Sequence, residues 1–191
     1  MDQRIAEQLT EVTLNSSVQV RCGASNAFLV TAALIEPLIT EFEMRGVYIS
    51  ASRGALELIN TLNEIGVATE NVRFIDCVSS ALLGGTESTF PNISFIDSPI
   101  MLERILLRTL YHLNTIPADS KFVILDSVNA LAIYNEERML AEYLHTLINT
   151  FRARDVLSVI MNVPDQTPPG VLANLDLYCT DLIDRGQVVI S

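Results

Sequence analysis

The apolar residues of this chain follow two spacings in turn, one of two residues and one of about 3.6 residues, along most of the sequence. The first spacing is typical of strands and the second of amphipathic helices. Repeated alternation of the two indicates a mostly parallel sheet with helices on its faces. The sequence therefore predicts a three-layer α/β/α fold. A C-terminal antiparallel hairpin is expected as well, because Asp184-Arg185-Gly186 favours a turn into a last short strand.

The expected elements can be given as residue ranges. Strands are expected at 17–22, 47–51, 72–76, 93–96, 121–126, 156–163, 175–183 and 187–190, and helices at 27–45, 56–65, 98–113 and 134–154. Ser98-Pro99 is expected to start the third helix, since Ser caps well and Pro suits the first helical position. A loose stretch is expected around Gly84-Gly85, and a loop at 166–170. With 191 residues the chain is predicted to form one domain, 1–191, with 1–15 as an N-terminal lead-in.

Composition excludes several classes of protein. Hydrophobic residues make up 49% of the chain and charged residues 18%, which is typical of a folded protein and not of a disordered one. The formal net charge of −11 opposes binding to nucleic acids and anionic lipids. The polar, acidic start does not resemble a signal peptide, and acidic residues interrupt every long apolar run. We therefore expect a cytoplasmic protein that does not enter a membrane.

Neither the cysteines nor the histidines indicate a metal site. Cys22, Cys77 and Cys179 are odd in number and far apart, so we expect buried thiols and no disulfide framework. His112 and His145 each lie in a helical pattern without a nearby partner in sequence, which predicts core or solvated histidines.

The run Lys121–Asp126, KFVILD, is an apolar strand that ends in an acid. In a phosphate-binding α/β protein such an acid holds Mg²⁺, and a G-x-x-x-x-G-K-[ST] loop holds the phosphates. No such loop occurs, and Lys121 is the only lysine in the chain. If Gly23 is taken as the first glycine of the loop, the second glycine, the lysine and the hydroxyl fall on Phe28, Leu29 and Val30.

The order of these segments resembles the RecA superfamily. The resemblance is carried by a strand, turn and long helix, then GVYIS, a helix, VRFIDCVS and KFVILDSVNAL, and it covers about 17–190. Within the superfamily the chain is similar to the KaiC-like ATPases widespread in archaea, and among them to members that lack the phosphate loop. The resemblance implies that Asp126 corresponds to the Walker B acid and Ser127 to the serine that commonly follows it. It also implies that Ala51-Ser52-Arg53 stands where KaiC-like enzymes carry a pair of catalytic glutamates.

Three functions are compatible with this pattern. The first is a pseudo-ATPase without catalytic residues or cofactor that acts as a protein-binding, regulatory or scaffolding subunit, with a protein partner or as a homo-oligomer. The second is a nucleotide-binding switch without turnover, with ATP and Mg²⁺ at a vestigial site formed by Gly23, Ser25, Asn26, Asp126 and Ser127. The third is a recombination or DNA-repair accessory protein, which the charge of −11 opposes.

Structural roles are alternatives for the same residues. Ser25 or Asn26 can cap the helix that follows, and the carboxylate of Asp126 can cap the turn or helix after its strand. The first long helix is apolar on most faces, which indicates either burial between other elements or contact with a partner. Arginines such as Arg53 are expected to pair with the abundant acids.

Overall fold

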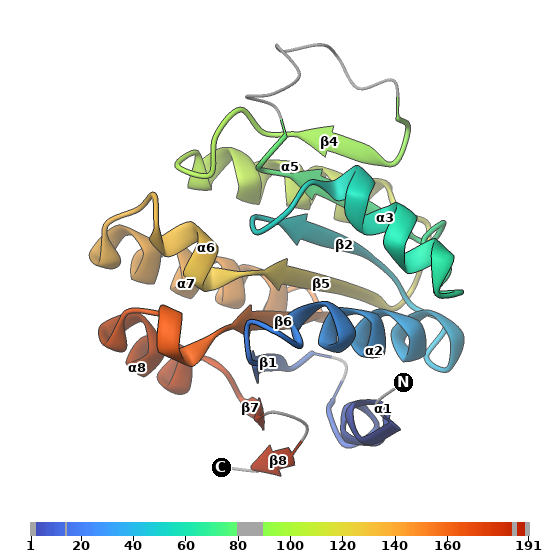
Figure 1. Cartoon of the computed structure of the whole chain (residues 1–191), viewed down its shortest axis with the longest axis horizontal. Helices are drawn as coiled ribbons and strands as arrows, with labels where there is room; N and C mark the ends of the chain where they lie inside the picture. The colour runs from blue at the N-terminus through green and yellow to red at the C-terminus, as the bar shows by residue number, and fades with distance from the viewer. Residues whose placement is uncertain (1–2, 14, 80–89, 185–186, 190–191) are drawn as a thin grey trace.

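The computed structural model describes residues 3–13, 15–79, 90–184 and 187–189, and it contains one eight-stranded sheet in the order β4-β3-β2-β5-β6-β1-β7-β8 (Figure 1). The strands are β1 Ser17–Arg21, β2 Arg45–Ser50, β3 Val72–Asp76, β4 Ile93–Phe95, β5 Lys121–Asp126, β6 Val156–Asn162, β7 Asp181–Asp184 and β8 Gln187–Val189. Neighbouring strands are parallel, except that β8 pairs antiparallel with β7. The predicted parallel sheet and C-terminal hairpin are confirmed. The expected Gly84-Gly85 stretch lies outside the described residues.

Helices cover both faces of the sheet (Figure 1). The helices α1 Gln3–Leu9, α2 Ala27–Thr40 and α3 Ala55–Glu64 share one hydrophobic core with the strands, and α5 Leu102–Thr115, α6 Val128–Ala132, α7 Glu137–Arg152 and α8 Pro169–Tyr178 share the other. A 3₁₀ turn, Pro164–Gln166, follows β6. The chain therefore has the predicted three-layer α/β/α architecture.

The central strand β5 shows how the sequence produces two cores. Phe122 and Ile124 belong to the core under α2 and α3, whereas Val123 and Leu125 belong to the core under α5 and α7. Successive side chains of a strand point to opposite faces, so a strand covered on both sides has to be apolar at every position. This requirement explains the continuous apolar run before Asp126.

Helix α2 is buried between the sheet and α1. Leu34, Ile35 and Leu38 of α2 are fully buried, and Ile5 and Leu9 of α1 belong to the same core. Of the two alternatives for this apolar helix, the structure shows burial between other elements. Most of the apolar surface of α2 is therefore buried within the chain itself.

Two predicted helix boundaries are wrong because a turn takes up residues that were assigned to the helix. Helix α2 ends at Thr40 and not at residue 45, since Glu43 has a φ of 51°, a left-handed conformation that redirects the chain into β2. Helix α5 begins at Leu102 and not at Ser98, because the Met101 amide donates to the Ser98 carbonyl at 3.0 Å and closes a separate turn.

The segments predicted as a helix at 134–154 and a strand at 175–183 are also built differently. The first begins later than predicted, because α7 covers only Glu137–Arg152, and a separate short helix that was not predicted, α6, precedes it. The second begins as helix α8, in which Val171 and Leu175 lie one turn apart and are both fully buried. Pro169 occupies the first turn of α8, where its fixed φ suits a helix. The strand β7 then starts only at Asp181.

The parallel arrangement brings the carboxyl ends of β1, β2, β3, β5 and β6 to one edge of the sheet (Figure 1). Connections at such an edge commonly carry the binding groups of α/β proteins. None of the helices in the described part of the chain is both long and apolar enough to cross a lipid bilayer.

Candidate functional site

The turn between β1 and α2, where a phosphate loop would lie, is closed by its own side chain. The Gly23 amide donates to Asn26 Oδ1 at 2.8 Å, and the Asn26 amide donates to the Gly23 carbonyl at 3.1 Å. Asn26 is the N-cap residue of α2, but its side chain makes no bond to the helix amides, and Ser25 is exposed. The expectation that Ser25 or Asn26 caps α2 through its side chain is therefore wrong. The side-chain oxygen of Asn26 instead accepts the hydrogen bond of the first backbone amide of the turn, that of Gly23.

The three positions that a phosphate loop would fill with glycine, lysine and hydroxyl carry no polar group. Leu29, at the lysine position, is 64% exposed, and Val30 is buried. The Arg53 guanidinium lies 5.6 Å from the centre of the Phe28 ring, a cation–π contact. Arg53 therefore stacks on the first turn of α2 and does not pair with an acid there.

Asp126 lies at the carboxyl end of β5, and its carboxylate bonds back to β2. The Tyr48 hydroxyl donates to Asp126 Oδ2 at 2.6 Å, and the Ser52 hydroxyl donates to the same oxygen at 3.0 Å. Burial raises the pKa of Asp126, although the hydrogen bonds from Tyr48 and Ser52 and the charge of Arg53 oppose the rise. Asp126 was expected to cap the following segment. That expectation is wrong, because α6 starts after Ser127 without a side-chain cap.

Tyr48 connects Asp126 to helix α2. Its ring is fully buried, and its hydroxyl oxygen lies 3.3 Å from Thr31 Oγ1 as well as 2.6 Å from Asp126 Oδ2. A chain of hydroxyl and carboxylate groups thus runs from α2 through β2 to β5. Thr31 and Tyr48 were not predicted as site residues. The available signal was a tyrosine inside an otherwise apolar strand, since a buried phenol hydroxyl usually requires a partner.

Asp76, at the end of β3, has the capping role that was predicted for Asp126. Asp76 Oδ1 accepts from the amides of Val78 and Ser79, each at 2.8 Å. Asp76 Oδ2 accepts from the Ala55 amide at 2.7 Å and from the Ser79 hydroxyl at 2.8 Å. Since Ala55 is the first residue of α3, this fully buried carboxylate holds the start of that helix and the turn after β3. An acid followed three residues later by Ser was the signal in the sequence.

The only lysine of the chain lies at the other end of β5 from Asp126. Lys121 is the first residue of the strand, and its Nζ donates to the Leu113 carbonyl at 2.8 Å. It therefore holds the end of α5 against the sheet and is not positioned beside the Gly23–Asn26 turn.

A cavity of about 490 Å³ opens at the same edge of the sheet. Residues after β2, β3, β5 and β6 line it, among them Ser52, Val78, Asn129 and Gln166. Asn129 holds this wall together, since its Nδ2 donates to Gln166 Oε1 at 3.2 Å and its Oδ1 accepts from the Val163 amide. None of the lining residues comes from the Gly23–Asn26 turn, so the cavity and that turn are separate features.

The histidines and cysteines occupy ordinary structural positions. His112 is buried and lies 2.8 Å from Ser94 Oγ, and burial, together with Arg108 and Arg73, lowers its pKa to about 4. His145 is exposed and its ring contacts Tyr178. Cys22 and Cys77 are buried free thiols as expected, whereas Cys179 is half-buried. Among the described residues, no three His, Cys, Asp or Glu side chains are grouped so that they could hold a metal ion.

Comparison with solved structures shows the same fold in two archaeal proteins. A KaiC-like protein, PH0186, from Pyrococcus horikoshii OT3 superposes with a TM-score of 0.63 at 17% identity, over 89% of this chain and 70% of that one. The flagellar accessory protein FlaH from Methanocaldococcus jannaschii superposes with a TM-score of 0.64 at 15% identity, over 96% of this chain and 75% of that one. No protein-family model and no curated sequence matches the chain. The similarity therefore shows a RecA-like α/β fold.

Proposed function

We propose that this RecA/KaiC-like domain is a pseudo-ATPase and acts as a protein-binding, regulatory or scaffolding subunit. The observation that carries the proposal is the position of the Tyr48 hydroxyl, between Thr31 and Asp126. In an active phosphate-loop protein, a hydroxyl on the helix after the loop and the acid of the Walker B strand hold Mg²⁺ together. In this chain the hydroxyl of Tyr48, whose ring is fully buried, donates to the corresponding acid, Asp126.

The charges that phosphoryl transfer requires are missing as well. Leu29 occupies the lysine position, and Lys121 lies at the opposite end of β5. After β2 the chain reads Ala51-Ser52-Arg53, with no carboxylate to orient an attacking water. Phosphoryl transfer depends on positioning and charge stabilisation, so the residues present do not fit a Mg²⁺–nucleotide.

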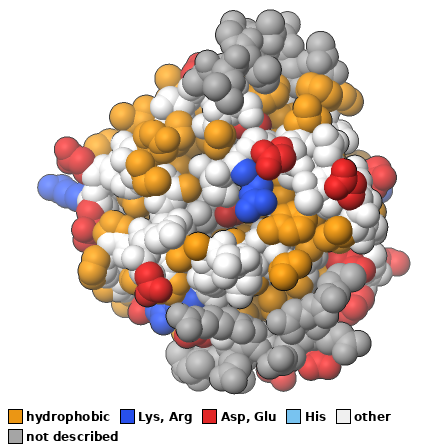
Figure 2. Space-filling model, in the orientation of Figure 1, with side chains coloured by type: hydrophobic (Ala, Val, Ile, Leu, Met, Phe, Trp, Pro, Cys, Tyr) orange, Lys and Arg blue, Asp and Glu red, His pale blue; other side chains and the backbone are white. Residues whose placement is uncertain are grey.

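Exposed apolar side chains support a role in protein binding. Among the described residues, the large hydrophobic side chains more than half exposed are Leu29, Ile100, Leu107, Tyr111, Ile133, Tyr134, Met139 and Leu177, with Ile65 at 50%. Figure 2 shows hydrophobic patches also on the α2–α3 face, with acidic side chains around them. Single exposed hydrophobics are normal, but a group of them on one face marks an interaction surface. The partner is another protein or a second copy of the chain.

The proposal is tested by measuring nucleotide hydrolysis and thermal stability together. No hydrolysis of ATP or GTP above a buffer blank is expected, and no change of melting temperature with Mg²⁺–ATP or Mg²⁺–ADP. A ligand at about 100 times its Kd would stabilise the fold by about 2.7 kcal/mol, which is readily measured.

The matched control is Asp126→Asn. Turnover in the wild type that Asp126→Asn abolishes would contradict the pseudo-ATPase proposal. A Mg²⁺-dependent stabilisation by nucleotide without turnover, lost in Asp126→Asn, would favour the nucleotide switch instead.

The partner class is tested separately by light scattering at micromolar concentration. Self-association would give a mass of at least twice 21.1 kDa, and a monomer would direct the search to a different protein. Soluble homo-oligomers mostly have closed symmetry, so a dimer or ring is the expected form of self-association. A monomer that also recovers no protein partner from native extract would contradict the proposed role.

A further inference from the structure

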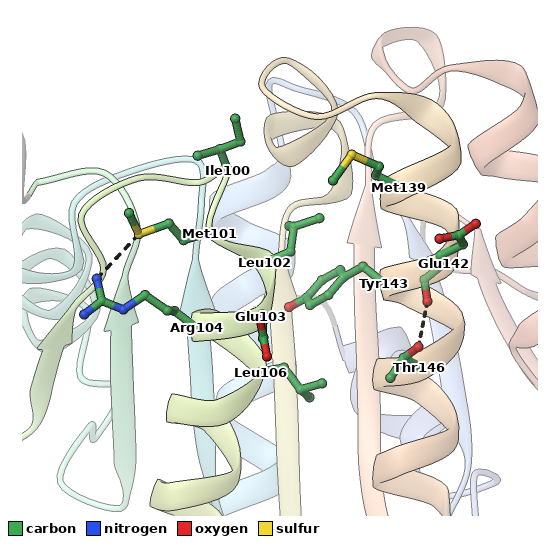
Figure 3. Close-up of a pocket in the computed structure, with 10 residues that line it drawn as sticks. All are labelled: Ile100, Met101, Leu102, Glu103, Arg104, Leu106, Met139, Glu142, Tyr143 and Thr146. Carbon is green, nitrogen blue, oxygen red and sulfur yellow. Dashed lines mark hydrogen bonds between the residues drawn. The ribbon is translucent and has the colours of Figure 1, made fainter.

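Helices α5 and α7 lie side by side with an open groove of about 570 Å³ between their first turns (Figure 3). Ile100 and Met139 stand at its upper rim, 57% and 53% exposed, and Leu102 and Tyr143 are buried along its floor. The groove lies on the face that α5 and α7 form, away from the Gly23–Asn26 turn and from α2, which belong to the other core. It is therefore a feature distinct from the vestigial nucleotide site.

An unpaired polar group lies beneath the floor of the groove, closed off from solvent. Tyr143 is only 7% exposed, and its hydroxyl has no hydrogen-bond partner among the described residues. Figure 3 shows this hydroxyl pointing away from α7 towards α5. Burial raises the pKa of Tyr143 well above its usual range, so the hydroxyl keeps its proton and can both donate and accept. A buried polar atom without a partner is costly, so this hydroxyl is a locally unfavourable group in the floor beneath the groove.

The charged residues that line the groove are two glutamates and one arginine. Glu103 and Glu142 line it, and Glu103 makes no ion pair among the described residues. The one arginine of the lining, Arg104, points away from the groove in Figure 3, where it donates to the Met101 sulfur at 3.5 Å, and it also pairs with Asp97. Arg138 bonds Glu142 at 3.0 Å, but both side chains are mostly exposed, and such pairs hold charges only weakly. A ligand with positive charges beside an apolar surface is complementary to this arrangement.

We propose that the groove between α5 and α7 binds an amphipathic helix of another protein, whose apolar face packs on Ile100 and Met139 and whose basic side chains meet Glu103 and Glu142. Grooves between two helices commonly receive a third helix through apolar anchors spaced along one face. Met101 and Met139 suit such contacts, because unbranched thioether side chains adapt to different shapes. This inference rests on the proposed function, since it names the partner of a protein-binding domain.

The net charge of the chain distinguishes this occupant from a second copy. With 23 acidic and 12 basic residues, each copy would bring more negative charge to a groove that already has two glutamates. Like charges in contact oppose association and suppress that pairing. A basic helix from a different protein satisfies both the apolar floor and the acidic rim.

The test is a selection from a phage-displayed library of amphipathic helices of about 15 residues, since shorter peptides are only marginal helices in water. The apolar positions are fixed and the others are varied among Lys, Glu, Gln and Ala. The wild-type protein is the target. We expect the enriched peptides to be basic beside the apolar face and to bind less tightly as salt concentration rises.

Variants locate the binding by fluorescence anisotropy with an enriched peptide. Met139→Glu is expected to raise the Kd by about tenfold or more, because it replaces an apolar contact of the bound helix with a charged side chain. Leu177→Glu is the matched control, since Leu177 is 77% exposed on α8 outside the groove, and it should leave the Kd unchanged. Glu103→Lys should weaken binding of the basic peptide, whereas Glu64→Lys on α3 should not.

Tyr143→Phe is the control for the floor beneath the groove. Because the hydroxyl has no partner and is closed off from the groove, its removal should leave the melting temperature unchanged or slightly raised and the Kd of the peptide unchanged. Peptides without basic enrichment, or peptides that bind Met139→Glu as tightly as the wild type, would overturn the inference.

Self-association gives a further decisive outcome. A homo-oligomer that Met139→Glu converts into a monomer would assign the groove to a second copy and overturn the basic-helix inference, while the proposed protein-binding function would stand. The proposed function itself fails in the nucleotide assays, which do not involve the groove. The two failures are thus distinguishable.

Discussion

Two buried carboxylates stand at the same edge of the sheet, on the strands that flank β2, and their surroundings differ. Asp76, after β3, accepts from three backbone amides and one hydroxyl. Asp126, after β5, accepts from two side-chain hydroxyls, those of Tyr48 and Ser52, on a single oxygen. Buried backbone amides need a hydrogen-bond partner in any fold, so Asp76 has a structural role: it accepts from the amides at the start of α3 and in the turn after β3. Asp126 has no amide to hold.

The difference indicates what each acid contributes. A carboxylate surrounded by amides is a structural cap, and its position follows from the turn that it closes. Asp126 is held only by hydroxyls. Under the proposed function it corresponds to the acid that binds Mg²⁺ in an active phosphate-loop protein, and the Tyr48 hydroxyl takes the place of the metal. Four predictions test this comparison.

The largest effect is expected from Asp76→Ala. The change leaves the amides of Ala55, Val78 and Ser79 without their acceptor, and buried amides that lose a partner cost about 1–3 kcal/mol each. We expect the free energy of unfolding in urea to fall by about 3–5 kcal/mol, with α3 exchanging its amide hydrogens earlier than α2. Asp76→Asn is the control, because its remaining oxygen still accepts and the loss should be smaller. A loss for Asp76→Ala below about 1 kcal/mol would contradict the structural role.

A smaller effect is expected from Tyr48→Phe. Removal of the hydroxyl leaves Asp126 with Ser52 alone and takes a partner from Thr31, at a cost of about 1–2 kcal/mol in the free energy of unfolding. A double-mutant cycle with Asp126→Asn measures the coupling between the two groups. Strict additivity would show that the 2.6 Å bond contributes nothing and would remove the main support for the proposed function.

Asp126→Asn is expected to change the free energy of unfolding by less than about 1 kcal/mol at neutral pH. The amide oxygen still accepts from both hydroxyls, and the substitution removes the cost of a buried charge. Asp126→Ala should cost about 0.5–2 kcal/mol, since both hydroxyls lose their acceptor. Equal losses for Asp126→Asn and Asp126→Ala would show that the charge itself, and not the acceptor, is needed, as at a cation site.

The smallest effect is a pH dependence. Because the pKa of Asp126 is raised in the fold, its contribution to stability is full below the unfolded pKa, about 3.9, and is lost as pH rises through the folded pKa. The difference in unfolding free energy between the wild type and Asp126→Asn should therefore favour the wild type most in acid and shrink towards neutrality. If the advantage of the wild type instead grew with pH, the fold would lower the pKa of Asp126 and not raise it.

His112 also contributes to the pH dependence of stability, since its folded pKa of about 4 is below its usual value. Its contribution is present above about pH 6.5 and is lost as pH falls towards the folded value, opposite in direction to that of Asp126. Both proteins in the comparison contain His112, so its titration cancels in their difference. A direct pH scan of the wild type alone would mix the two.

The sequence predicted two strands with correct bounds at both ends. Strands β3 and β5 match the expected ranges, because in each a mainly apolar and buried run ends abruptly at an acid. The ends of the sheet were less well predicted. Helix α8 was taken for a strand, because its burial on one side comes from α7, which no local pattern reveals. The order of strands brings Gly23, Asn26 and Asp126 to one edge, as the resemblance implied.

The sequence by itself determined which groups of a phosphate-loop site are missing from the chain, because a missing lysine, glycine or glutamate is a property of composition and spacing. Only the tertiary structure decided what the remaining groups bond. Tyr48 reaches Thr31 and Asp126, which lie 17 and 78 residues away in the chain, and Asp76 reaches Ala55, 21 residues away. Such bonds depend on register and on the direction of buried side chains, and those are fixed only when the strands pair and the helices pack on both faces.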